Sequence, residues 1–174
     1  SSKPVLNISN WTVAAGEQVF VHGPSGCGKS TLLNLLSGML QADSGEITVM
    51  GQRLDQISNR QRDRFRANHI GYIFQQFNLI PYLDAIDNIK LAHQFAKDNS
   101  SSSLENKIQS LLSSFNIAPA HWQKPVARLS IGQQQRVAAA RALIGQPKII
   151  IADEPTSALD HDNREAFIEL LLEQ

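Results

Sequence analysis

The stretch Gly23-Pro24-Ser25-Gly26-Cys27-Gly28-Lys29-Ser30-Thr31 fits the nucleotide-phosphate loop pattern G-x-x-x-x-G-K-[ST]. Its three glycines allow the backbone to curl around an anion with successive N–H groups turned inward. Lys29 can then reach the β- and γ-phosphates, and the Ser30 hydroxyl can ligate Mg²⁺. We therefore expect residues 23–31 to bind a nucleoside triphosphate.

The residues on both sides of this loop support the same interpretation. Residues 17–22 (EQVFVH) are typical of a short buried strand, and the apolar spacing from Lys29 to Leu40 predicts an amphipathic helix. A strand, a glycine loop and a helix in that order point a helix N-terminus at the phosphate. The alternative, a chance glycine-rich turn, does not account for this order.

Length and composition restrict the class of protein. The 174 residues are enough for one domain with a real core, and 16 basic against 16 acidic residues give zero formal net charge. A single cysteine excludes an internal disulfide bond, and no apolar run is long enough to cross a bilayer. Neither a signal peptide nor a nucleic-acid partner is indicated, and alternating Arg60, Arg62, Arg64 and Arg66 are interpreted as a solvated helix face. We expect a protein that is soluble by itself and reaches a membrane only through a partner.

Apolar, β-rich segments alternate with helical ones, which is typical of an α/β fold with a mainly parallel sheet. The expected strands besides 17–22 are residues 5–8, 11–13, 46–50, 70–74 and 148–152, the last with the most buried pattern. The expected helices besides 29–40 are residues 60–68, 84–115 with a break at 98–103, 132–144 and 164–172.

A second chemical signal is the run Ile149-Ile150-Ile151-Ala152-Asp153-Glu154. An apolar strand that ends in two carboxylates suits a metal-assisted phosphate site. Asp153 would hold Mg²⁺ through a water molecule, and Glu154 would orient and polarise the attacking water. Alone, this pattern is as typical of a strand end that meets solvent; together with the phosphate loop it favours the catalytic interpretation.

A third signal, Leu129-Ser130-Ile131-Gly132-Gln133-Gln134-Gln135-Arg136, completes a set of motifs. With GPSGCGKST, FQQFNLIP (residues 74–81) and ADEPTSALD (residues 152–160), the chain resembles the ATP-binding subunit of ABC transporters over almost its whole length. The amino-acid sequence of residues 73–81 and 130–143 most resembles that of the lipoprotein-release and macrolide-export type of subunit.

The resemblance implies an architecture. It is an α/β P-loop NTPase core, RecA-like, with a mainly parallel sheet, N-terminal antiparallel β strands and an inserted α-helical subdomain. Residues 1–80 and 146–174 would form the ATP-binding core, and residues 81–145 the helical subdomain with the signature motif.

The resemblance also implies roles for single residues. Gln75 would contact Mg²⁺ and sense the γ-phosphate; the bland alternative is a surface glutamine after a strand. Residues 130–133 match the signature that contacts ATP bound to a second subunit, and their members are Ser130, Ile131, Gly132 and Gln133. A serine hydroxyl and a glycine N–H at a helix start are suited to an anion. Asp160 would couple the two sites across the dimer, although it also suits the N-cap of the next helix.

Three departures from the family pattern bear on turnover. Position 131 is Ile where the family usually has Gly, and a β-branched residue does not readily take φ > 0. The adenine-stacking aromatic residue expected roughly thirty residues before Lys29 is missing, and so is the catalytic histidine expected after the last helix. We therefore expect this chain to bind ATP with Mg²⁺ and to hydrolyse it poorly.

The leading hypothesis is a transport-coupled ATPase. ATP would close a head-to-tail dimer of ATP-binding subunits, hydrolysis to ADP and phosphate would open it, and a membrane permease would use the motion to export or extrude a substrate. The subunit would then be cytoplasmic and bound to the inner face of the cell membrane through the permease. The alternative is a nucleotide-binding module that dimerises with weak or no turnover.

Overall fold

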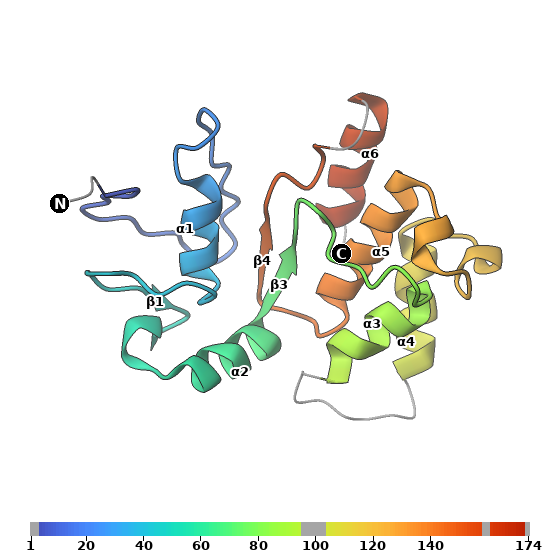
Figure 1. Ribbon diagram of the computed structural model, residues 1–174, viewed down its shortest axis with the longest axis horizontal. Coiled ribbons are helices and arrows are strands. Elements are labelled where there is room, and N and C mark those ends of the chain that lie inside the picture. The colour runs from blue at the N-terminus through green and yellow to red at the C-terminus, as the bar shows by residue number, and fades with distance from the viewer. Residues whose placement is uncertain (1–3, 95–103, 158–160, 173–174) are drawn as a thin grey trace. The chain divides into compact units, whose positions relative to one another are not determined.

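The computed structural model describes residues 4–94, 104–157 and 161–172 (Figure 1). The chain forms two compact units, Ser1–Arg62 and Asp63–Gln174. This division after Arg62 differs from the predicted one, in which residues 1–80 and 146–174 form the core and 81–145 the helical subdomain. The predicted division stays a prediction.

In the first unit, helix α1 spans Lys29–Leu36 and begins directly after the glycine loop (Figure 1). It ends at Ser37 because Gly38 takes the left-handed conformation, with φ 71°, and donates its N–H to the Leu35 carbonyl. The helix predicted to reach Leu40 is therefore about one turn shorter than expected.

A small hairpin follows, with β1 at Thr48–Val49 and β2 at Gln52–Arg53. The strands are antiparallel and pair Thr48 with Arg53. The two connecting residues, Met50 and Gly51, both have positive φ, 51° and 77°, as the tight hairpin turn requires. The strand predicted over 46–50 is thus confirmed in its centre.

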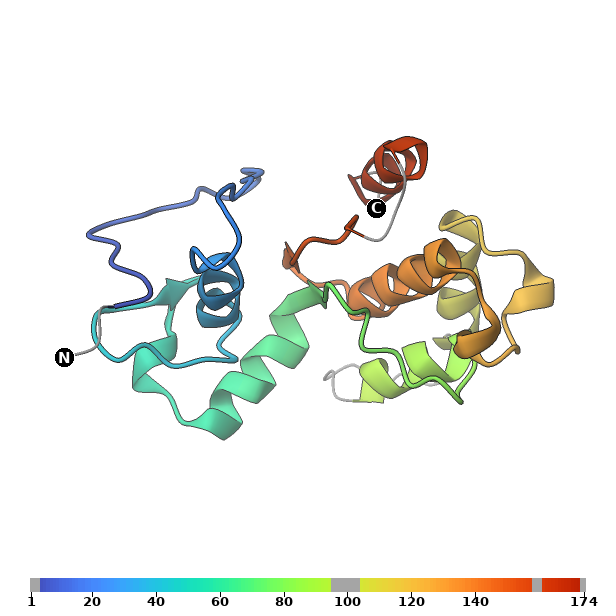
Figure 2. The same ribbon diagram turned by 45° about the horizontal axis from the view of Figure 1, so that its top comes forward.

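Helix α2, Asn59–His69, follows the short 3₁₀ helix η1, Leu54–Gln56, and matches the helix predicted over 60–68 (Figure 2). The expected solvated row of arginines is wrong at Arg62, which is buried. Its guanidinium donates to the carbonyls of Leu54 and Ile57 and to the side chains of Gln41 and Asn59. Four acceptors explain how this cation can be withdrawn from water.

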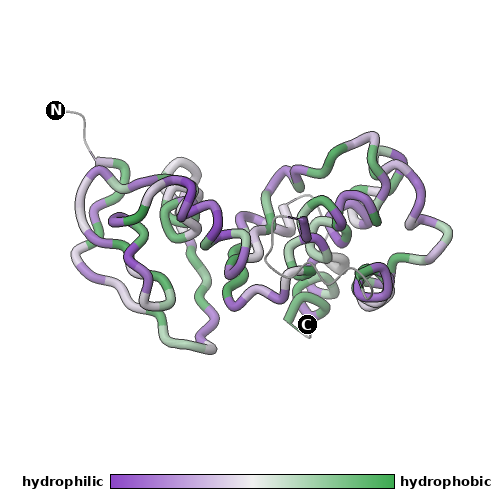
Figure 3. The backbone as a smooth tube through the Cα atoms, turned by 90° about the horizontal axis from the view of Figure 1, so that it is seen from below, coloured by the Kyte–Doolittle hydropathy of each residue, from purple (hydrophilic) through white to green (hydrophobic). Residues whose placement is uncertain are grey.

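The strands predicted at residues 5–8, 11–13 and 17–22 are not formed in the part of the chain that the structure describes. Apolar and polar stretches alternate along the chain after the N-terminus (Figure 3), and Phe20 is 68% exposed. An apolar pattern indicates that a segment can be extended, but a strand also needs a partner for its N–H and C=O groups. Here the antiparallel pair is β1 with β2 instead.

In the second unit, β3 (Ile70–Ile73) lies parallel to β4 (Ile149–Ala152), pairing Ile70 with Ile149 and Ile73 with Ala152 (Figure 1). Both strands were predicted within one residue. The prediction that residues 148–152 are the most buried strand is wrong, because β3 is buried along its whole length whereas only Ile151 is buried in β4. Residues on both faces of β3 are buried, whereas Ile150 of β4 is 42% exposed.

Helices make up the rest of this unit, and α3, α4 and α5 pack against one another (Figure 2). Their bounds are α3 Ala85–Gln94, α4 Leu104–Ser114, η3 Pro119–His121, η4 Val126–Arg128, α5 Ile131–Leu143 and α6 His161–Leu172. The helical pattern predicted for 84–115, 132–144 and 164–172 is confirmed, and the break predicted at 98–103 lies outside the described residues.

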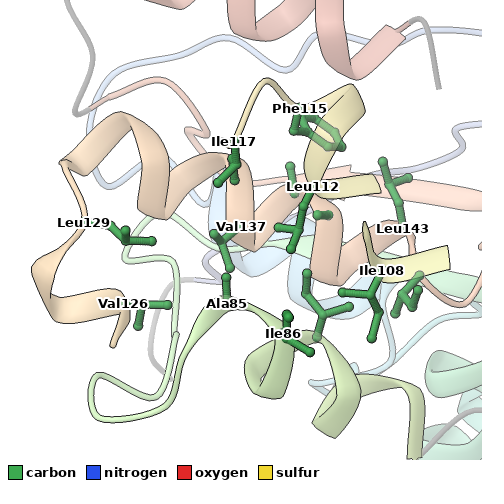
Figure 4. Close-up of a cluster of buried hydrophobic side chains, with 14 of the residues drawn as sticks. Ala85, Ile86, Ile108, Leu112, Phe115, Ile117, Val126, Leu129, Val137 and Leu143 are labelled. Atoms are coloured by element: carbon green, nitrogen blue, oxygen red, sulfur yellow. The ribbon is translucent and has the colours of Figure 1, made fainter. Parts of the chain in front are cut away.

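The core of this unit is a single cluster of apolar side chains drawn from the three packed helices and the segments between them (Figure 4). Its members include Ala85, Ile86, Ile108, Leu112, Phe115, Ile117, Val126, Leu129, Val137 and Leu143. Asn88 is a buried polar residue of α3: its amide nitrogen donates to the carbonyls of Ile80, Leu83 and Asp84, and its oxygen accepts from the Ile80 N–H. The segment after β3 is thereby fastened to α3.

We predict that Gly71→Ala destabilises the second unit. A Cβ at this position would lie 2.6 Å from the Ala142 carbonyl oxygen of α5 and 2.9 Å from Pro147 Cγ, so the helix or the strand must shift. We expect a loss of about 1–3 kcal/mol in the free energy of unfolding, measured with urea. Ile150→Val, at the paired position in β4, serves as the control and should change little. Unfolding of Gly71→Ala at the wild-type urea midpoint would contradict this packing.

Candidate active site

The phosphate loop, residues 23–31, curls around the amine of its own lysine. Lys29 Nζ donates to the carbonyls of Gly23, at 2.9 Å, and Pro24, at 3.2 Å. Gly26 and Gly28 have φ values of 79° and 100°, which side-chain-bearing residues rarely adopt. The loop therefore already has the curled form that the sequence motif predicts.

Two of its glycines also have side chains close to the position of a Cβ. A Cβ on Gly23 would lie 2.7 Å from Cys27 Sγ, and one on Gly28 would lie 2.8 Å from Leu6 Cδ2. Cys27 itself is exposed and forms no disulfide. The loop leads directly into α1, whose first turn carries no acidic side chain, so the partial positive charge at the helix N-terminus is not offset there.

In the second unit, candidate residues lie where the two parallel strands end. The Asp153 N–H donates to the Ile73 carbonyl at 3.0 Å, extending the pairing of β3 and β4 by one residue. Gln75 Nε2 then donates to Glu154 Oε2 at 2.8 Å across 79 residues of sequence. The structure thus brings together three residues that the sequence analysis had singled out from two separate motifs.

The backbone at Glu154 is bent into a tight turn. Glu154 has φ 46°, a left-handed conformation that costs a non-glycine residue about 1 kcal/mol or more, and its carbonyl accepts from the Ser157 N–H at 3.1 Å. We call residues 153–157 the acidic turn. This turn directs the Glu154 carboxylate towards Gln75 instead of along the strand.

Tyr72 reports on the electrostatics next to this turn. Burial, and after it the negative charge of Asp153, raises the pKa of Tyr72 to about 12. Tyr72 is buried in β3, with its ring centroid 4.4 Å from that of Phe74. The strand ends therefore combine buried aromatic side chains with the negative charge of Asp153.

The signature residues form the start of α5. Ser130 is the N-cap: its Oγ accepts from the Gln133 N–H at 3.2 Å, and Gln133 Oε1 accepts from the Ser130 N–H at 3.0 Å. Ile131 is the first helical residue, so it has the negative φ of a right-handed helix, and the expected conflict with φ > 0 does not arise. Its side chain is 55% exposed, beside Gly132.

Two further side chains of α5, Gln135 and Arg141, were missed by the sequence analysis. Gln135 donates to the Pro155 carbonyl of the acidic turn, and Arg141 donates to the carbonyls of Phe77 and Asn78. Burial lowers the pKa of Arg141. Polar residues in an amphipathic helix are ordinarily assigned to its solvent face, so periodicity alone could not have identified them. Asp160, predicted to couple two sites, lies outside the described residues.

We predict that Tyr72 titrates with a pKa near 12, against an ordinary value of 10. Because the folded state holds the phenol proton more tightly than the unfolded state, the resulting stability is complete below pH 10 and is lost as the pH rises towards 12. The chain has two tyrosines, so tyrosinate absorbance of a Tyr82→Phe variant measures Tyr72 alone. Adding Asp153→Asn to this variant should lower the midpoint of the titration. A midpoint at the ordinary pKa of 10 with and without Asp153→Asn would contradict the buried placement of Tyr72.

Comparison with known proteins agrees with these motifs. Residues 6–157 match the family described as "ABC transporter". The chain is 37% identical over 172 residues to the lipoprotein-releasing system ATP-binding protein LolD of Psychrobacter arcticus, covering 99% of this chain and 76% of that one. It is 38% identical over 167 residues to the macrolide export ATP-binding/permease protein MacB of Pasteurella multocida, covering 96% and 25%. A dimeric, post-hydrolysis structure of the ATP-binding cassette MJ0796 with ADP and Pi superposes with a TM-score of 0.88 at 37% identity, covering 96% of this chain and 73% of that one.

Proposed function

Because the chain belongs to the ABC transporter family, we propose that it is the ATP-binding and ATP-hydrolysing subunit of a membrane transporter. The observation that carries the hydrolytic part is the 2.8 Å hydrogen bond between Gln75 and Glu154 at the ends of paired parallel strands. This hydrogen bond holds the Glu154 carboxylate beside the Gln75 amide, which we propose senses the γ-phosphate during hydrolysis.

ATP would be held by its phosphates in the phosphate loop. The N-terminus of α1 suits the anionic oxygens, and Lys29 would exchange its two loop carbonyls for the β- and γ-phosphates. Since those carbonyl contacts keep the amine within the loop, little reorganisation precedes binding.

The residues proposed for Mg²⁺ are Ser30, Gln75 and Asp153, and their side chains suit that ion. All three supply oxygen atoms, the ligands that Mg²⁺ prefers, and Asp153 also supplies negative charge beside buried Tyr72. Among the described residues, no three or more His, Cys, Asp and Glu side chains form a group that could hold a metal ion, so the proposed site has Asp153 as its one carboxylate. When bound, Mg²⁺ neutralises phosphate charge; orienting the attacking water falls to Glu154, whose carboxylate Gln75 holds in place.

A complete site would need a second subunit. The N-cap serine and Gly132 at the start of α5 offer a hydroxyl and backbone N–H groups to an anion, yet Ser130 is bonded within its own capping box. We propose that this N-terminus contacts the γ-phosphate of ATP bound by a partner subunit. The superposing cassette is dimeric, which supports a pair of subunits, and we propose that the pair is head-to-tail.

The membrane partner is proposed from the relatives. Their names describe export and lipoprotein release, and one of them joins an ATP-binding part to a permease. Among the helices that the structure describes, none is both long and apolar enough to cross a bilayer. A permease in the cell membrane would then hold this subunit at the inner, cytoplasmic face, with residues 1–80 and 146–174 as the core and 81–145 as the helical subdomain.

A second candidate function is a nucleotide-dependent dimerising module with weak turnover, which the exposed Ile131 favours. Its branched side chain stands 55% exposed where the partner's phosphate would approach. Ile131→Gly separates the two candidates: a large rise in hydrolysis indicates a module restrained at this position, whereas an unchanged rate indicates a competent enzyme.

We predict that Lys29→Ala and Glu154→Gln fail at different steps. Removing the amine should weaken ATP binding about tenfold or more, because a charge-assisted contact to phosphate is lost. Replacing the carboxylate by an amide should keep binding and lower kcat by about 10²–10⁴, because the amide cannot polarise water. Fluorescent-nucleotide titration and phosphate release measure the two steps.

Size-exclusion chromatography with ATP completes this test, since slow hydrolysis should make the dimer of Glu154→Gln persist. The matched control is Glu169→Gln on the exposed side of α6, which should behave as wild type. Hydrolysis by Glu154→Gln at the wild-type rate would refute the assignment of the catalytic carboxylate.

A further inference from the structure

We propose that α5 holds both loops of the catalytic pair in place through Gln135 and Arg141, which act as positioning residues for hydrolysis. The two loops are the acidic turn, residues 153–157, and the glutamine loop, residues 74–80, which carries Gln75. This inference rests on the proposed function and adds to it a pair of residues that contact neither phosphate nor metal.

Gln135 is the contact to the acidic turn. Its side chain is fully buried, and Nε2 donates to the carbonyl of Pro155, the residue directly after Glu154. Among the described residues, its Oε1 has no hydrogen-bond partner. Burying an amide with one unsatisfied atom lowers the free energy of unfolding. An apolar side chain of the same size would avoid this cost but could not hold the Pro155 carbonyl.

Arg141 is the contact to the glutamine loop. Nη2 donates to the Phe77 carbonyl at 2.6 Å and Nη1 to the Asn78 carbonyl at 2.5 Å. Phe77 and Asn78 have φ values of 53° and 49°, so this loop, like Glu154, contains left-handed non-glycine residues. The planar guanidinium bridges two successive carbonyls, which a lysine ammonium cannot match.

Both strained turns are therefore held by one helix. Left-handed conformations of non-glycine residues persist only where the surroundings fix them. The helix can supply that restraint because it is itself anchored: Val137 and Leu143 pack in the apolar cluster (Figure 4), and Ala138, Ala139 and Ala140 are buried. The Gln75–Glu154 hydrogen bond then closes the link between the two loops.

This arrangement also has a consequence for a dimer. Ser130 is the N-cap of the same helix. A displacement of the helix N-terminus would therefore reach the acidic turn through Gln135 and the glutamine loop through Arg141. Contact of the signature with a partner's ATP would thus act on this chain's own Gln75 and Glu154.

The test compares Gln135→Met with Gln134→Met. Methionine keeps the length of the side chain and removes both polar atoms, so loss of the Pro155 contact is offset by removal of the unsatisfied Oε1 and the melting temperature should change little. Gln134 is the matched control because its Nε2 donates to the Leu129 carbonyl at 3.0 Å, away from both loops.

The first readout does not depend on ATP. Hydrogen exchange at the Ser157 amide, which is bonded to the Glu154 carbonyl, should accelerate about tenfold or more in Gln135→Met and stay unchanged in Gln134→Met. Equal exchange in both variants would overturn the role of Gln135. This outcome is independent of whether the proposed ATPase function holds.

The second readout is hydrolysis. In Gln135→Met and Arg141→Met, kcat should fall about tenfold or more with KM for ATP unchanged, because the phosphate loop is intact and only the placement of the catalytic pair is lost. Arg141→Lys should recover part of the rate. In a Glu154→Gln background, Gln135→Met should cause no further fall. The proposal would be overturned if Gln135→Met had the wild-type kcat, or if Gln135→Met lowered kcat as much in the Glu154→Gln background as in the wild type. Absence of hydrolysis by the wild-type chain would instead refute the proposed function.

Discussion

The candidate site depends on the in-register parallel pairing of β3 with β4. Because Ile73 lies opposite Ala152, both strands end at the same level, and the residues that follow them meet without a long excursion of the chain. Gln75 and Glu154 can then share a hydrogen bond across 79 residues. A shift of one residue in this register would turn every side chain of β4 to the other face and separate the pair.

Burial around this pairing explains both the stability of the strands and the electrostatics beside them. β3 is covered along its whole length, partly by α5, whose backbone approaches Gly71 too closely for any side chain there. The same burial keeps the Tyr72 phenol protonated and intensifies the field of Asp153. The negative charge at the strand ends, where we propose that Mg²⁺ binds, therefore lies beside a strand that is buried along its whole length.

Helix α5 connects the chemistry to the fold. Its N-terminus is capped by Ser130, its apolar face joins the core cluster, and its polar side chains Gln135 and Arg141 reach both loops. Hydrogen bonds of this kind add little net stability but restrict geometry, which is what a site with left-handed residues at Phe77, Asn78 and Glu154 needs.

The sequence by itself determined the phosphate loop and the helices of the second unit, because local spacing and turn chemistry depend on neighbouring residues. Asp153 and Glu154 followed from their place after an apolar run, and Gln75 from the family resemblance. It also predicted strands in residues 5–22 that the described chain does not form, and a solvated Arg62 that is buried. Only the tertiary structure decided which strand is most covered, that Ile131 sits in helical backbone, and that Gln135 and Arg141 face inward. Strand pairing and the satisfaction of buried polar groups depend on partners far away in sequence, which periodicity cannot identify.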